Sequence, residues 1–131
     1  MKPSSTLLHL LIILVLAVAS CAAPAGSDAD PLLLKCWTHA FEEDTPENGL
    51  TFRSCINHTF PAARYRQTFT LQENGVVEYS VLAPNDAHTT ENGKWNYNAK
   101  SKKLKISNNE NAVMHEYEVL ELGDDILRVK E

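Results

Sequence analysis

Three cysteines are the residues of this sequence whose type and spacing most directly suggest chemistry. Cys21 follows a long apolar run near the start of the chain, whereas Cys36 and Cys55 lie well beyond that run. A disulfide uses two thiols, so an exported chain with three cysteines leaves one of them unpaired. The sequence therefore predicts a separate chemical role for one cysteine.

The first twenty residues predict an export signal. Lys2 is their only charged side chain, and the apolar stretch from Leu7 to Val18 is too short for a permanent membrane helix, which needs about 20 apolar residues. The sequence VASC at 18–21 resembles the lipobox of bacterial lipoproteins, in which the first mature cysteine is diacylated. We predict a signal peptide over 1–20 and lipidation of Cys21. The alternative is an ordinary signal peptidase cutting at an Ala-x-Ala-like site.

The next ten residues predict a tether. Residues 21–30 are small and polar, and they read as a flexible link between a lipidated cysteine and a domain over 31–131. Ala22 follows Cys21 where enteric lipoproteins retained in the inner membrane have Asp. We therefore expect a protein anchored to the cell envelope by its lipid, on the outer membrane where the organism has one.

The two remaining cysteines predict a disulfide. Assigning Cys21 to the lipid leaves Cys36 and Cys55 in the exported part of the chain, where thiols are oxidised. A bridge between them closes a loop of about twenty residues and contributes about 3 kcal/mol in the chain-entropy model. The alternative is that both are free, buried thiols.

Length and charge limit the class of protein. Removing residues 1–20 from the 131 leaves 111 residues, enough for one small domain. That domain has 11 basic and 17 acidic side chains, a formal charge of −6. An acidic surface argues against nucleic acid as a partner and against a second, electrostatic contact with a membrane.

The sequence contains none of the common catalytic motifs. Gly-x-Ser-x-Gly, His-Glu-x-x-His, a phosphate-binding glycine loop and Cys-x-x-Cys are all absent. His39, His58, His88 and His115 occur singly, and the pair Asp86-x-His88 lies in a stretch typical of a turn. We predict neither an enzyme nor a metal site, and no cofactor.

Two adjacent carboxylates have two possible uses. Neighbouring residues on a strand point to opposite faces, so Glu42 and Glu43 cannot both act on one pocket. They are either solvated charges at a hairpin end, or one of them pairs with Arg64 or Arg66 and closes one end of the domain.

The elements that position these residues are predicted to be strands. Glu-Asn-Gly occurs at 47–49, 73–75 and 91–93, and Asn-Gly is a strong turn signal. The first segment also fits a short helix behind Asp30 and Pro31, but its β-branched and aromatic content favours a strand. We predict eight strands, following one another in space and joined mostly by short loops, near 32–41, 50–57, 64–72, 76–82, 93–98, 103–107, 114–122 and 126–130.

Side-chain alternation predicts the registers of two strand pairs, and the two cysteines predict that of a third. A three-residue loop with Gly75 in the left-handed conformation gives the middle hairpin one apolar face. The pairs expected there and in a later hairpin are Phe69 with Tyr79, Leu71 with Val77, Trp95 with Ile106 and Tyr97 with Leu104. Setting Cys36 opposite Cys55 pairs His39 with Phe52 and turns inward Trp37, Phe41, Phe52 and Ile56. Eight antiparallel strands with one apolar face each predict an all-β, up-and-down barrel.

The runs LLLKCWTHAFEE, RYRQTFTLQENG, ENGKWNYNAKSKKLKI and YEVLELGDDILRV resemble small bacterial lipocalin-like proteins. In that family an early strand carries a Trp, Gly-x-Trp begins a later strand, and the last hairpin alternates leucines around an acidic turn. The resemblance covers about residues 32–130. It implies a lipocalin-like barrel that binds a small hydrophobic or amphipathic ligand.

Six aromatic residues decide between two uses of such a barrel. They either line a ligand cavity or fill the interior as core: Trp37, Phe52, Phe69, Tyr79, Trp95 and Tyr97. The alternative function is an interaction or inhibitor protein that contacts a macromolecular partner through the loops at 84–92 and 60–63.

Overall fold

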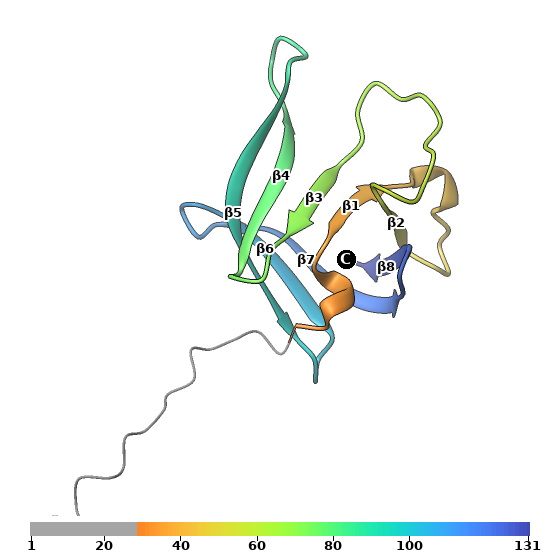
Figure 1. Cartoon of the computed structure of the whole chain (residues 1–131), viewed down its shortest axis with the longest axis vertical. Helices are drawn as coiled ribbons and strands as arrows, with labels where there is room; N and C mark the ends of the chain where they lie inside the picture. Colours follow the sequence, from red (N-terminus) through yellow and green to blue (C-terminus); the bar gives the residue numbers. More distant parts are fainter. Residues whose placement is uncertain (1–28) are drawn as a thin grey trace, which may run out of the picture.

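The computed structural model describes residues 29–131 (Figure 1). The predicted signal peptide, the lipidation site Cys21 and the tether as far as residue 28 lie outside the described residues. Among residues 29–131 no helix is long and apolar enough to cross a membrane. The elements are η1 (Pro31–Leu33), β1 (Cys36–His39), η2 (Phe41–Glu43), β2 (Leu50–Ser54), β3 (Thr68–Leu71), β4 (Val76–Leu82), β5 (His88–Asn98), β6 (Lys103–Asn108), β7 (Val113–Leu122) and β8 (Ile126–Lys130).

The eight strands form one closed antiparallel barrel, which confirms the predicted fold class. Strands β3 to β8 pair in sequence order, and the β1–β2 hairpin closes the circle between β3 and β8. We call the end with the β1–β2, β4–β5 and β6–β7 loops the upper end. The other end, with the β3–β4, β5–β6 and β7–β8 loops, is the lower end.

The strand order departs from the predicted one at a single place. β1 lies between β2 and β3, so β2 pairs with β8 and not with β3. Because β2 ends at the lower end and β3 begins at the upper end, residues 55–67 return past β1 along the barrel. The expected short connection is therefore wrong, and this longer segment contributes to the upper end.

The middle hairpins have the registers that alternation predicts. β3 and β4 pair Phe69 with Tyr79 and Leu71 with Val77. Gly75 has a φ of 75° in the loop between them, the left-handed conformation that the three-residue loop requires. The next hairpin likewise has the predicted partners, Trp95 with Ile106 and Tyr97 with Leu104.

The first hairpin has the predicted register but is shorter than predicted. His39 lies opposite Phe52 as expected. The expectation that Phe41 and Ile56 face the interior is wrong, because they are 43% and 85% exposed. Both residues lie beyond the ends of the paired strands, where alternation no longer decides which way a side chain points.

Several strand ends differ from the prediction. The segment 32–41 begins with the short helix η1, because Pro31 has no N–H for a ladder and the Asp30 carboxylate accepts from the Leu32 N–H at 2.9 Å. η2 follows at the other end of that segment. The larger remaining differences are an earlier end of β2 at 54, a later start of β3 at 68 and an earlier start of β5 at 88, and the other bounds differ by at most one residue.

The lower end of the barrel is filled by core side chains. Leu33 of η1 is fully buried, and its carbonyl accepts a hydrogen bond from the indole of Trp37 at 3.1 Å. The indole of Trp95 donates to the Gln72 carbonyl at 2.9 Å. These bonds satisfy the polar atoms of both tryptophans, which can therefore serve as core. The upper end is different.

Candidate functional site

A pocket of about 270 Å³ opens at the upper end of the barrel. We call it the upper pocket. Its apolar wall consists of side chains from β3, β4, β6 and β7, namely Phe69, Tyr79, Val81, Leu82, Ile106 and Met114. Its polar lining consists of Tyr65, Gln67, Thr68, Ser80 and His115. A mainly apolar hollow with a few polar groups is the usual composition of a small-molecule site.

A glycine on β5 packs against the wall of this pocket. Gly93 occupies an inward position next to the Tyr79 ring, and a Cβ there would lie 3.2 Å from Tyr79 Cε1. The Tyr79 hydroxyl donates to Glu91 Oε2 at 3.1 Å, which fixes the ring along the pocket wall. Burial and the neighbouring Glu91 together raise the pKa of Tyr79, so its hydroxyl stays protonated and donates.

The polar side of the upper pocket is a hydrogen-bonded group on β7 and the segment before β3. Gln67 Nε2 donates to the Tyr117 hydroxyl at 3.1 Å and lies 3.2 Å from His115 Nε2. The rings of His115 and Tyr117 stack with centroids 5.3 Å apart and an angle of 8°. With the Gln67 amide donating, the imidazole accepts at Nε2 and carries its proton on Nδ1.

These polar groups are uncharged at neutral pH. Burial lowers the pKa of His115, and the carboxylate of Glu131 opposes that effect. Burial raises the pKa of Tyr117 to about 12, against a hydrogen bond from Gln67 that lowers it. The upper pocket can therefore offer neutral donors and acceptors to a ligand, and it carries no positive charge of its own.

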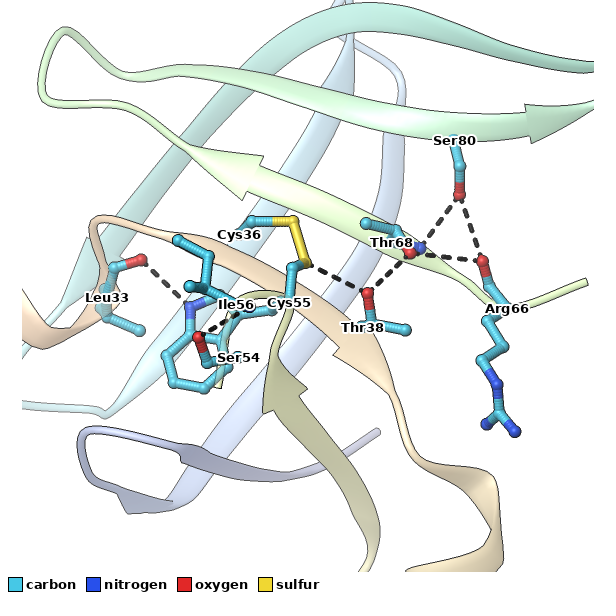
Figure 2. Close-up of a disulfide and its surroundings, with 10 residues drawn as sticks. Leu33, Cys36, Thr38, Ser54, Cys55, Ile56, Arg66, Thr68 and Ser80 are labelled. Atoms are coloured by element: carbon cyan, nitrogen blue, oxygen red, sulfur yellow. Dashed lines mark hydrogen bonds between the residues drawn. A yellow bond between two sulfur atoms is a disulfide. The ribbon is translucent and has the colours of Figure 1, made fainter. Parts of the chain in front are cut away.

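A chain of polar contacts on the outer face holds the rim of the pocket (Figure 2). The predicted disulfide joins Cys36 to Cys55, with their Cα atoms 5.5 Å apart. Thr38 Oγ1 lies 3.2 Å from Cys55 Sγ and 2.9 Å from Thr68 Oγ1, and the Thr68 N–H donates to Ser80 Oγ at 3.0 Å (Figure 2). Since Thr68 and Ser80 line the pocket, the disulfide belongs to the structure that positions its rim.

The six predicted aromatic residues are divided between the core and the pocket. Phe69 and Tyr79 line the upper pocket. Trp37, Phe52 and Trp95 are buried within the core cluster, and Tyr97 is half-buried against it. The lining residues that the sequence did not suggest include Gln67 and His115, although their inward positions follow from extending the strand alternation.

The predicted ion pair at one end of the barrel is present. Arg66 pairs with Glu42, and one of its nitrogens donates to Glu42 Oε2 at 2.9 Å. The same guanidinium donates to the His39 carbonyl at 3.1 Å and to the Pro61 carbonyl at 2.8 Å. Arg66 therefore connects β1, η2 and the segment before β3 at the upper end.

We predict a pH dependence of stability from this ion pair. The Arg66 guanidinium beside Glu42 lowers the pKa of that carboxyl from 4.5 to about 2. Because the Glu42 carboxyl has a lower pKa in the folded chain than in the unfolded chain, its ionised form stabilises the folded protein above pH 4.5. This contribution to the free energy of unfolding is lost as the pH falls from about 4.5 to about 2. Urea unfolding measured across this range should show a shallower loss of stability for Arg66→Met than for the unmodified protein.

The matched control for that measurement is Arg64→Met. Arg64 pairs with Asp86 at 2.6 Å, but these side chains are 76% and 59% exposed. Such an exposed pair contributes little, so the control should keep the unmodified pH profile. Equal profiles for all three proteins would contradict the role given to Glu42.

Other features of the described residues give no comparable site. A larger hollow of about 680 Å³ runs outside the barrel beside the β5–β6 turn, and its lining of asparagines, lysines and turn residues makes it an open surface groove. Residues 29–131 contain no group of three or more metal-ligating side chains. Of the pair Asp86 and His88, the carboxylate is bound to Arg64.

Among known protein families, the model of a lipocalin-like domain matches this chain over residues 37–129. The chain belongs to the lipocalin-like domain family. The match begins at Trp37 in β1 and ends at Val129 in β8, so it spans the whole barrel. No curated protein and no solved structure matches the chain. The chain therefore shares its lipocalin-like barrel with this family.

Proposed function

We propose that this lipocalin-like protein binds one small, largely apolar molecule in the upper pocket. Barrels of eight strands are just wide enough either to be filled by their own side chains or to hold one small ligand, as lipocalins do. Here η1 and the two tryptophans fill the lower end, and the hollow lies at the upper end. This pocket, mainly apolar and open at one end, is the observation that supports ligand binding most strongly.

The size of the pocket limits the ligand. A dry cavity of about 150 Å³ accepts benzene, and sites for drug-sized ligands begin near 300 Å³. A pocket of about 270 Å³ therefore suits a molecule with one or two rings, or a short branched chain. A long acyl chain would have to extend beyond the mouth.

The chemistry of the pocket favours binding over catalysis. Its lone imidazole, His115, contacts Gln67 and stacks on Tyr117, and neither of these is a nucleophile activated by a base. The hydroxyl of Ser80 is occupied by the Thr68 N–H. We propose that the protein acts by holding its ligand and not by converting it.

The proposed place of action is the cell envelope. The apolar run before Cys21 and the small residues that precede this cysteine support a lipid anchor, which would carry the barrel at a membrane surface. The mass of the mature protein tests this part of the proposal, because diacylation of Cys21 would increase it and unmodified cleavage would not.

Blocking the pocket tests the proposed binding. Prodan is a neutral naphthalene dye with two fused rings whose fluorescence increases in apolar sites, and we expect saturable binding to one site. Val81 is an inward, half-buried residue of the pocket wall, so Val81→Trp should fill much of the space and weaken binding about tenfold or more. Val113→Trp is the matched control, since Val113 is 54% exposed and is not part of the lining.

A macromolecular partner is the second candidate function. Leu82 and Met114 line the mouth of the upper pocket and are 38% and 40% exposed, and Val113 lies next to Met114. These apolar side chains could extend a contact surface onto the loop at 83–87. If no dye binds to the unmodified protein, or if Val81→Trp leaves its binding unchanged, the ligand proposal is wrong and this surface becomes the better candidate.

A further inference from the structure

The surroundings of the upper pocket carry an excess of negative charge. None of the residues that line the pocket is Lys, Arg, Asp or Glu. Two carboxylates lie beside it: Glu91 accepts from the lining residue Tyr79, and Glu131 Oε1 lies 4.0 Å from Nδ1 of the lining residue His115. The formal charge of the whole chain, −5, has the same sign.

Glu91 is an exposed residue beside the pocket, and it is joined to the pocket wall through the Tyr79 hydroxyl. It pairs directly with Tyr79 across β4 and β5, on the face of the sheet that points into the barrel. The next inward residue of β5 is Gly93, and the Tyr79 ring packs against it. Within residues 29–131 Glu91 forms no ion pair with a lysine, arginine or histidine.

The nearby arginines are already neutralised. Arg64 and Arg66 flank the lining residue Tyr65, but the first is bound to both oxygens of Asp86 and the second to Glu42. His115 does not add a positive charge, because its burial lowers its pKa. An anionic ligand would therefore meet uncompensated carboxylates, whereas a cationic one would find a partner for its charge.

The aromatic lining also favours a positively charged ligand. Tyr65, Phe69 and Tyr79 all contribute to the pocket. The faces of such rings carry partial negative charge and attract ammonium groups that lie within about 6 Å. An apolar amine could thus bury its carbon skeleton among these rings and still keep its charged group at the wet rim beside Glu91.

We infer that the upper pocket selects small organic cations, in particular amines with an aromatic or aliphatic body, through the carboxylate of Glu91. This inference rests on the proposed function, because it names the chemical class of ligand for the same pocket. It predicts a preference for cations over neutral and anionic molecules of equal shape.

Three probes of nearly equal shape test the inference by isothermal titration. They are phenethylamine as the cation, phenethyl alcohol as the neutral molecule and hydrocinnamate as the anion. The amine should bind about tenfold more tightly than the alcohol, and the anion should bind most weakly. Glu91→Gln should reduce the preference for the amine over the alcohol to about twofold.

Glu78→Gln is the matched control. Glu78 is an exposed residue of β4 on the outward face, opposite Asn92, so its removal changes the net charge equally without changing the pocket. Equal affinities for the three probes, or a preference that survives Glu91→Gln, would overturn the inference and leave the proposed binding function standing. Failure of all three probes and of the neutral dye would overturn both.

Discussion

Replacing Gly93 with alanine is expected to reduce the free energy of unfolding by about 3 kcal/mol. A Cβ at this position would lie 2.1 Å from the Ser107 carbonyl oxygen and 3.2 Å from Tyr79 Cε1. The first of these atoms belongs to the backbone of β6, so the clash cannot be relieved by rotating a side chain. The β5–β6 pair would have to separate beside the upper pocket, and ligand binding should weaken together with stability.

Urea unfolding followed by tryptophan fluorescence measures this loss, with Gly123→Ala as the matched control. A Cβ at Gly123 would meet only Cγ2 of the Ile126 side chain, at 3.2 Å, and that side chain can move. The control should change the free energy of unfolding by less than about 1 kcal/mol. Similar stabilities for the two variants would show that β5 and β6 separate easily at this point, and would contradict a destabilising clash between a Cβ at position 93 and the Ser107 carbonyl oxygen.

Local pairing could be predicted from the sequence because alternation leaves few choices. A shift of one residue in the β3–β4 hairpin would turn Phe69 and Leu71 to the other face, so only one register gives an apolar interior. The same reasoning gives the pairing of Trp95 with Ile106, and setting Cys36 opposite Cys55 gives that of His39 with Phe52. Each of these pairs is present.

The order of the strands could not be predicted in the same way. Strand β2 carries Thr51 and Phe52, and either edge of the β1–β2 hairpin could join the rest of the sheet. The choice of β8 as the partner of β2 is a long-range one, and no turn motif encodes it. The sequence predicts strand ends at 55–57 and 64–67, but both belong to the connection that this choice requires.

The candidate site was only partly predictable for a related reason. Alternation predicts that Trp37 and Tyr79 both point inward. It does not predict that η1 covers Trp37, whereas Tyr79 lines an open pocket. Gln67 and His115 were missed because a polar residue on a strand is more often an exposed one. Recognising them required the tertiary contacts of Tyr117.

Removing the disulfide is expected to reduce the free energy of unfolding by about 3 kcal/mol, because Cys36 and Cys55 are 19 residues apart and their bridge limits the unfolded chain. For a domain of this size the loss corresponds to a fall in Tm of roughly 10–20 °C. The double variant Cys36→Ala with Cys55→Ala should still form the barrel, since the hydrogen bonds of the β1–β2 ladder remain.

Thermal unfolding with and without a reducing agent tests this prediction. The unmodified protein should lose stability when reduced, while the double variant should not respond to the reductant, which makes it its own control. The variant should also bind the neutral dye less tightly, because Thr38 loses its contact with Cys55 Sγ and the contacts through Thr68 to Ser80 at the pocket rim loosen. Unchanged dye affinity in a fully folded variant would show that the rim is positioned by the strands alone and that the disulfide only limits the unfolded state.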